Sequence, residues 1–199
     1  TLNVTGSGTI VAGSNGALRC YNVLSFNGPT IRGGTYNYGA AIYVNEGTAT
    51  MSGGTITGAN SASWGPVFVS KGTFNMTGGS ITQNTAAFGG AVGLNNDSTF
   101  NMSGGTIANN TATNQGGAVY LQSTAKFIMT NSATITANNA AYGAAIAGKT
   151  GTTVDLRGGT ISRHSSAASQ WGAVYIRGAT LKISGCKITG NTGGFGGAI

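Results

Sequence analysis

The chain has 199 residues, 36 of them glycine, and a formal net charge of +7 from ten basic and three acidic residues. The glycines follow no Gly-X-Y period, which excludes collagen, and the β-branched and aromatic content excludes a disordered chain. No stretch approaches 18 consecutive apolar residues, so the sequence predicts no transmembrane segment. The basic residues accompany no recognition motif, and we expect no specific nucleic-acid partner.

A glycine-flanked doublet of alanine or proline and an aliphatic residue recurs along the whole chain. Its copies are Ala17-Leu18, Ala41-Ile42, Pro66-Val67, Ala91-Val92, Ala118-Val119, Ala145-Ile146, Ala173-Val174 and Ala198-Ile199. The successive spacings, by subtraction of residue numbers, are 24, 25, 25, 27, 27, 28 and 25 residues. A period of this length indicates a solenoid or another repeat array.

Within one repeat, three short segments alternate apolar and polar residues, as strands do. In the repeat 73–94 they are residues 73–76, 80–82 and 91–94, with Gly-Gly and Asn-Thr turns between them. No segment has a 3.6-residue apolar period, so we expect no helix. The sequence predicts an all-β parallel β-helix of seven to eight coils, each of 25–28 residues with three short strands. Strand spacing makes this a rod roughly 34 Å long.

The alternation assigns inward positions that stack from coil to coil. For the second strand of each coil it predicts a buried column of Ile10, Tyr36, Ile56, Ile81, Ile107, Ile135, Ile161 and Ile188. The segment 20–28 is irregular and is a candidate cap. The whole chain, 1–199, is expected to be one domain, and a segment of a longer chain, because both ends fall within the strand pattern.

The residue types that perform catalysis are sparse. Glu46, Asp97 and Asp155 are the acidic residues, and no two of them are expected to be close enough to cooperate. His164 has no predicted nucleophile beside it, and two distant cysteines with one histidine make no metal site. Cys20 and Cys186 are expected about six coils apart, beyond disulfide reach, and so to be inert thiols or to pair between molecules. We therefore expect no enzyme activity and no cofactor.

The second strand of most coils presents a pair of hydroxyl residues outward. These pairs form a candidate ice-binding face of Thr55, Thr57, Ser80, Thr82, Thr134, Thr136, Thr160 and Ser162. A flat grid of methyl and hydroxyl groups can order water. The alternative is an ordinary solvated sheet face, because threonine is a favoured strand residue.

Aromatic residues form two rows. The first, just before the glycine corner, contains Tyr38, Trp64, Phe88, Tyr142, Trp171 and Phe195, and we expect these rings to stack on one another. The second row lies on the third strand, where alternation points it away from the core. Its members are the candidate glycan contacts Tyr43, Phe68, Tyr120 and Tyr175.

Five Asn-x-Ser/Thr sequons are candidate glycosylation sites in a host that has the machinery. They begin at Asn3, Asn75, Asn96, Asn101 and Asn109. The abundance of asparagine, serine and threonine explains most of them by chance.

Three phrases, starting at Ile81, Ile107 and Ile188, combine Asn-Thr with Gly-Gly-Ala-aliphatic. They resemble the repeats of adhesin-like and polymorphic outer-membrane-protein-like surface proteins, over essentially the whole chain. This resemblance implies a right-handed, pectate-lyase-like β-helix and an extracellular or cell-surface location, without catalysis by the repeats.

The function expected from this resemblance is a non-catalytic structural or adhesive β-helix that serves as a rigid stalk or passenger. Its expected partners are further copies of itself, end to end or lateral, or acidic or neutral glycans. An ice-binding solenoid is the first alternative, and a polysaccharide-processing enzyme is the second.

Overall fold

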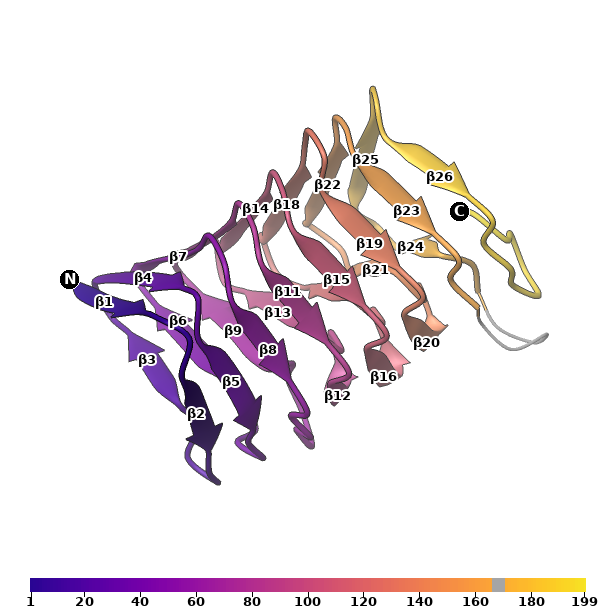
Figure 1. Cartoon of the computed structure of the whole chain (residues 1–199). Helices are drawn as coiled ribbons and strands as arrows, with labels where there is room; N and C mark the ends of the chain where they lie inside the picture. The colour runs from indigo at the N-terminus through magenta and orange to yellow at the C-terminus, as the bar shows by residue number, and fades with distance from the viewer. Residues whose placement is uncertain (166–170) are drawn as a thin grey trace.

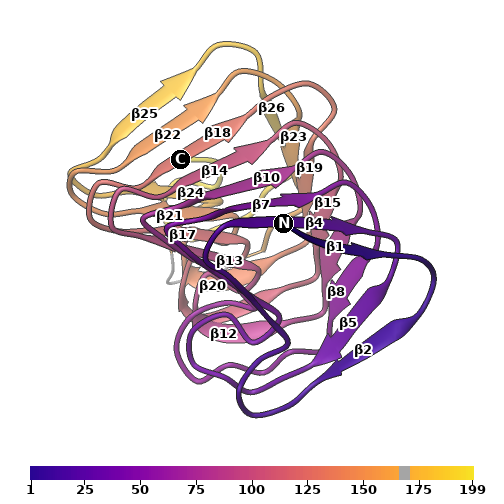
Figure 2. The same ribbon diagram turned by 90° about the vertical axis from the view of Figure 1, so that its left-hand side faces the viewer.

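The structure is a computed structural model, which describes residues 1–165 and 171–199, and its regular structure in these ranges is entirely β-strand. The strands form four parallel sheets that run along the axis of a solenoid. Figure 1 shows the coils succeeding one another from the indigo N-terminus to the yellow C-terminus. Figure 2, from the N-terminal side, shows the coils stacked behind one another.

Three sheets extend over most of the coils. The first contains β1 (Leu2–Thr5), β4 (Val23–Asn27), β7 (Thr48–Met51), β10 (Thr73–Met76), β14 (Thr99–Met102), β18 (Lys126–Met129), β22 (Thr153–Leu156) and β25 (Thr180–Ile183). The second contains β2 (Thr9–Ala12), β5 (Thr30–Gly33), β8 (Thr55–Thr57), β11 (Ser80–Thr82), β15 (Thr106–Ala108), β19 (Thr134–Thr136), β23 (Thr160–Ser162) and β26 (Lys187–Thr189). The third contains β3 (Leu18–Cys20), β6 (Ile42–Asn45), β9 (Val67–Ser70), β13 (Val92–Asn95), β17 (Val119–Leu121), β21 (Ile146–Gly148) and β24 (Val174–Ile176).

A short fourth sheet, which the sequence did not predict, crosses the middle coils. It contains β12 (Thr85–Phe88), β16 (Thr111–Gln115) and β20 (Asn139–Tyr142). β12 and β16 begin on the threonine of the Asn-Thr phrases that were interpreted as turns, and β20 begins at the equivalent Asn139. The alternating burial of Thr85 and Ala86 is that of a strand. The predicted parallel β-solenoid with three strands per coil is confirmed, and the middle coils add a fourth.

Each strand pairs with its equivalent one coil away, so equivalent residues stack. In the first sheet, Phe74 is in register with Ala49 on one side and Phe100 on the other. The rings of Phe74, Phe100 and Phe127 form a continuous stack, with centroids 5.1 and 5.0 Å apart and interplanar angles of 27° and 24°. All three rings are fully buried. Like side chains therefore fill the core in columns.

The second coil differs from the prediction. Ile31 on β5, not Tyr36, occupies the buried column of the second sheet, because Ile31 is in register with Ile10 and Ile56. Tyr36 lies after β5 and is half-buried. The segment expected to be an irregular cap contains β4, whose Leu24 and Phe26 are buried in the first-sheet column.

A buried asparagine ladder closes the turn that follows the second sheet. The side-chain Oδ1 of Asn110 accepts the backbone N–H of Asn84 (3.1 Å), and the Oδ1 of Asn138 accepts that of Asn110 (2.9 Å). The residue before each ladder asparagine has a positive φ, for example 57° at Gln83 and 56° at Asn109. The residue with positive φ turns the chain. The side chain of the next residue then accepts a hydrogen bond from a backbone N–H of the preceding coil.

In three of the Gly-Thr-Ile phrases, those of Gly54, Gly105 and Gly159, the glycine is required by its conformation and by its neighbours. Gly105 has φ 77°, and a Cβ there would lie 2.7 Å from Met76 Cε and 2.8 Å from the Gly79 carbonyl oxygen. Residues with a Cβ disfavour this conformation. A glycine at this turn therefore allows adjacent coils to approach closely.

Removing one ring from the stacked column should destabilise the solenoid strongly. Phe100→Ala deletes a fully buried side chain between two other rings, and we expect a loss of about 3–5 kcal/mol in the free energy of unfolding, measured by urea denaturation. Thr99→Ala, on the opposite face of the same strand, is the matched control and should change stability by less than about 1 kcal/mol. Equal losses in the two variants would contradict the column as the main source of stability.

Candidate functional site

The outward side of the second sheet presents two columns of hydroxyl side chains in register. One column runs through Thr55, Ser80, Thr106, Thr134 and Thr160, and the other through Thr57, Thr82, Ala108, Thr136 and Ser162. Strand geometry spaces neighbours about 4.8 Å apart along the axis and about 7 Å apart along a strand. The eight residues predicted as an ice-binding face therefore lie together on one regular surface.

Each column of this threonine face meets a cation, and some of its hydroxyls form hydrogen bonds with one another. Arg32 is in register with Thr57, and Lys187 is in register with Thr160, so each hydroxyl column meets a cation at one end. At its other end the first column continues through Thr30 and Thr9, and the second through Thr189. The hydroxyl oxygens of Thr55 and Ser80 lie 3.2 Å apart, a hydrogen bond between coils. Near its C-terminal end the face is hollowed by a depression of about 530 Å³ lined by Thr134, Thr136, Thr160, Ser162, Arg163, Lys187, Thr189 and Gly190.

The second aromatic row is only partly available for contact. Phe68 and Tyr120 are each 4% exposed, so the prediction that their rings point outward into solvent is wrong. Trp64 covers both, with ring centroids 4.9 Å from Phe68 and 5.5 Å from Tyr120. Trp64 reaches over the row because Gly93 lies between them: a Cβ at Gly93 would be 2.7 Å from Trp64 Cε3. Tyr43 and Tyr175 remain half-buried.

The first aromatic row forms only part of the expected stack, with ring contacts between Trp64 and Phe88 and between Trp171 and Phe195. The backbone of Phe88 forms a β-bridge with that of Trp64 on one side and is in register with Gln115 on the other. The backbone of Trp171 forms β-bridges with those of Tyr142 and Phe195. The ring centroids of Trp171 and Phe195 are 5.2 Å apart. This row is a packing element that also covers the third sheet.

A tyrosine groove opens beside the covered part of the row. It has a volume of about 280 Å³ and is lined by Tyr36, Tyr38, Tyr43, Phe68, Ser70, Asn95 and Asn96. The rings of Tyr38 and Tyr43 each lie 5.5 Å from that of Phe68. Burial raises the pKa of Tyr43, and the neighbouring phenols of Tyr21 and Tyr36 add to this effect. The phenol of Tyr43 is therefore a neutral hydrogen-bonding group at neutral pH.

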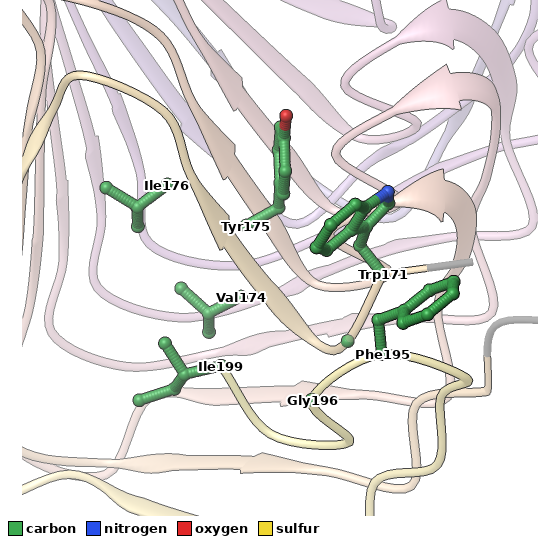
Figure 3. A pocket seen from close by; sticks show the side chains of 8 residues that line it. Trp171, Val174, Tyr175, Ile176, Phe195, Gly196 and Ile199 are labelled. Carbon is green, nitrogen blue, oxygen red and sulfur yellow. The ribbon is translucent and has the colours of Figure 1, made fainter. Parts of the chain in front are cut away.

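A second hollow, of about 270 Å³, lies on the last described coil. Figure 3 shows Trp171 and Phe195 close together, with Val174, Ile176 and Ile199 grouped to one side. Ile176 is in register with Gly148, and Val174 with the buried Ile146. The lining continues the core columns and the aromatic row, so this hollow is a packing surface.

The three carboxylates lie on different coils and have different partners. Glu46 forms an exposed ion pair with Lys71 (3.7 Å), and Asp97 accepts the hydroxyl of Thr124. Asp155 accepts two hydrogen bonds from Arg157, at 2.9 and 2.7 Å, and these bonds lower the pKa of Asp155. The structure thus does not bring any two of them together as an acid–base pair.

His164 lies in the turn after β23, where it is a buried member of the asparagine ladder. Its Nδ1 accepts the backbone N–H of Asn138 (3.1 Å), and its Nε2 lies 3.1 Å from the Ile135 carbonyl oxygen, to which it donates. The backbone N–H of His164 in turn donates to Asn191 Oδ1 (3.0 Å). Burial lowers the pKa of His164, and the two backbone contacts only partly oppose this. The side chain is a neutral imidazole in an asparagine's place.

The sequons lie in different environments. Asn3, Asn96 and Asn109 are exposed, and the latter two have positive φ in turns. Asn75 and Asn101 are half-buried neighbours on the first sheet, and Asn101 Nδ2 donates to Asn75 Oδ1 (2.9 Å). These two amides are therefore engaged with each other.

The cysteines are both free thiols, on the third strand of the first coil and just before β26. Burial raises the pKa of both Cys20 and Cys186, which disfavours the reactive thiolate. Among residues 1–165 and 171–199, no three metal-binding side chains gather into a site.

One sequence pattern could have revealed the buried ladder that was missed. The ladder residues Asn84, Asn110, Asn138, His164 and Asn191 all stand three positions after a core isoleucine. The groove has no comparable pattern, because Tyr36 and Tyr38 come from an irregular corner. In the described part of the chain, no helix has the length and apolarity to cross a membrane. Comparison with protein-family models, curated proteins and solved structures found no match.

The stability of the wild-type chain should fall below about pH 6.5 because of His164. Its pKa is lower in the folded than in the unfolded state, so the unfolded state takes up the proton first as the pH falls. We expect a loss on the order of 1 kcal/mol between pH 7.5 and 5.5, measured by urea unfolding. His164→Asn restores the ladder residue and should remove this dependence, whereas an unchanged pH profile in that variant would contradict the assignment.

Proposed function

We propose that this chain is a non-catalytic, rigid β-helical module of an extracellular or cell-surface protein that presents an adhesive surface. The observation that carries the proposal is continuous stacking: strands of the first and second sheets pair in register through eight coils. Such a rod holds side chains at fixed positions over its whole length. The resemblance to adhesin-like, pectate-lyase-like repeats supports the same function.

The chemistry of the surface fits adhesion to glycans. The threonine face and the tyrosine groove offer hydroxyl, amide and phenol groups, and the net charge of +7 adds attraction for acidic polymers. Each carboxylate forms its own local contact on a separate coil. A preformed surface of this kind loses little conformational entropy on binding.

Adhesion can be tested directly with the purified chain. We expect retention on at least one immobilised neutral or acidic polysaccharide, or concentration-dependent self-association in sedimentation velocity. Binding to an acidic polymer should weaken as salt is raised from 50 to 500 mM, because charge attraction is screened. A chain that is monomeric and retained on no polysaccharide would contradict the adhesive function.

Ice binding is the second candidate function, and the register of the threonine face favours it. From β8 to β23, nine of the ten outward positions in the two columns carry a hydroxyl, and only Ala108 lacks one. A rigid, regular grid is what an ordered water layer requires. The hollow near Lys187 and the hydrogen bonds between hydroxyls of adjacent coils reduce the flat, free area, so adhesion remains the leading proposal.

If this face binds ice, Thr57→Tyr or Thr136→Tyr should abolish thermal hysteresis and ice shaping, because a bulky ring breaks the grid. Thr50→Tyr places the same ring on the outward side of the first sheet and should retain both activities. Hysteresis that is absent from the wild-type chain, or equally lost in all three variants, would rule out the threonine face as an ice-binding surface.

A further inference from the structure

The tyrosine groove combines rigid aromatic walls with polar groups at one edge. Tyr43 and Phe68 are in register on β6 and β9, and the next outward pair, Asn45 and Ser70, is also in register. Asn95 continues this polar row on β13. An aromatic row and a polar row thus run side by side along the third sheet, and the groove spans both.

The polar edge is fixed in place before any ligand arrives. Asn95 Oδ1 accepts hydrogen bonds from the Asn96 backbone N–H (3.0 Å), Gln122 Nε2 (3.2 Å) and Ser123 Oγ (2.9 Å). Asn96 Nδ2 lies 3.4 Å from Ser70 Oγ. The amide groups therefore keep their positions, and an arriving ligand does not have to order them.

The phenol hydroxyls of the groove can form further hydrogen bonds. Within the described residues, the hydroxyls of Tyr36, Tyr38 and Tyr43 make no hydrogen bond to protein, and the side chain of Tyr38 is 46% exposed. No ionised side chain lines the groove. The guanidinium of Arg19 stacks 5.1 Å from the Tyr36 ring centroid, and the charged residues Lys71 and Asp97, which follow the lining residues Ser70 and Asn96 in the chain, are not part of the lining. The groove therefore suits a neutral ligand with both an apolar face and hydroxyl edges.

We propose that this groove binds a neutral sugar residue of a glycan, with its C–H face on the rings of Tyr43 and Tyr38 and its hydroxyls on the phenols and on Asn96. The volume of about 280 Å³ is at the small end for ligand pockets, as one unit of a longer chain requires. The inference rests on the adhesive function proposed above and gives it a ligand class and a position.

The test is titration of the purified chain with the neutral tetrasaccharides of cellulose, mannan, starch and chitin, followed by calorimetry and saturation-transfer NMR. At least one should bind, with little effect of salt. Tyr43→Ala and Tyr38→Ala should each weaken binding by about tenfold, the order expected for losing one aromatic contact. Tyr21→Ala removes a tyrosine that is 60% exposed outside the groove and should leave binding unchanged.

The possible results distinguish a failure of the groove proposal from a failure of the proposed adhesive function. Thermal unfolding must first show that both variants are folded; Tyr38 is exposed enough for its replacement to be tolerated. If neither substitution affects binding, the groove is not the binding site, but the adhesive function still holds. The same conclusion would follow if the chain were retained on acidic polysaccharides alone. If no tetrasaccharide binds at millimolar concentration, the groove proposal is wrong. If no polysaccharide of either kind is retained and the chain is monomeric, the adhesive function fails as well.

Discussion

Parallel pairing of each strand with its own equivalent one coil away is the constraint on which this structure depends. Because the pairing is in register, a residue always meets the residue that holds the same position in the next coil. Similar side chains therefore stack on one another inside over several coils, although Phe74 meets the smaller Ala49 on one side. The Phe74–Phe100–Phe127 stack and the isoleucine column show this stacking along the rod. Stability is then built from contacts between adjacent coils.

The same constraint acts on buried polar groups at the turns. The backbone N–H donors that follow the second sheet point along the axis, where the next coil must supply an acceptor. Asn84, Asn110 and Asn138 do this with their amides, and His164 does it with an imidazole nitrogen. The substitution conserves the hydrogen bonds but introduces a group that can be protonated. One position thus makes an otherwise pH-insensitive ladder responsive to acid.

Much of the fold could be predicted because the repeated phrases encode position directly. The errors in the second coil have a specific cause: Gly33-Gly34-Thr35-Tyr36 mimics the Gly-Gly-Thr-Ile phrase, whereas the true equivalent, Gly28-Pro29-Thr30-Ile31, carries a proline at the second glycine position. The candidate sites were predicted less well. Alternation gives the direction of Phe68 and Tyr120, but it does not show that Trp64 from a neighbouring corner reaches across Gly93 to cover them. The tyrosine groove depends on the same long-range packing.

The two candidate surfaces differ in how they use this regularity. The threonine face repeats one chemistry with a single interruption at Ala108, and Arg32 and Lys187 each end one of its two columns at one side. The tyrosine groove exists because the repetition fails: Gly93 interrupts the aromatic row, Trp64 fills that space, and the rings of Tyr38 and Tyr43 on the preceding coil are left partly uncovered. A repeat array offers a discrete ligand a unique position only where it is irregular. For that reason a single sugar residue is better matched to the groove, and an extended, periodic surface such as ice to the threonine face.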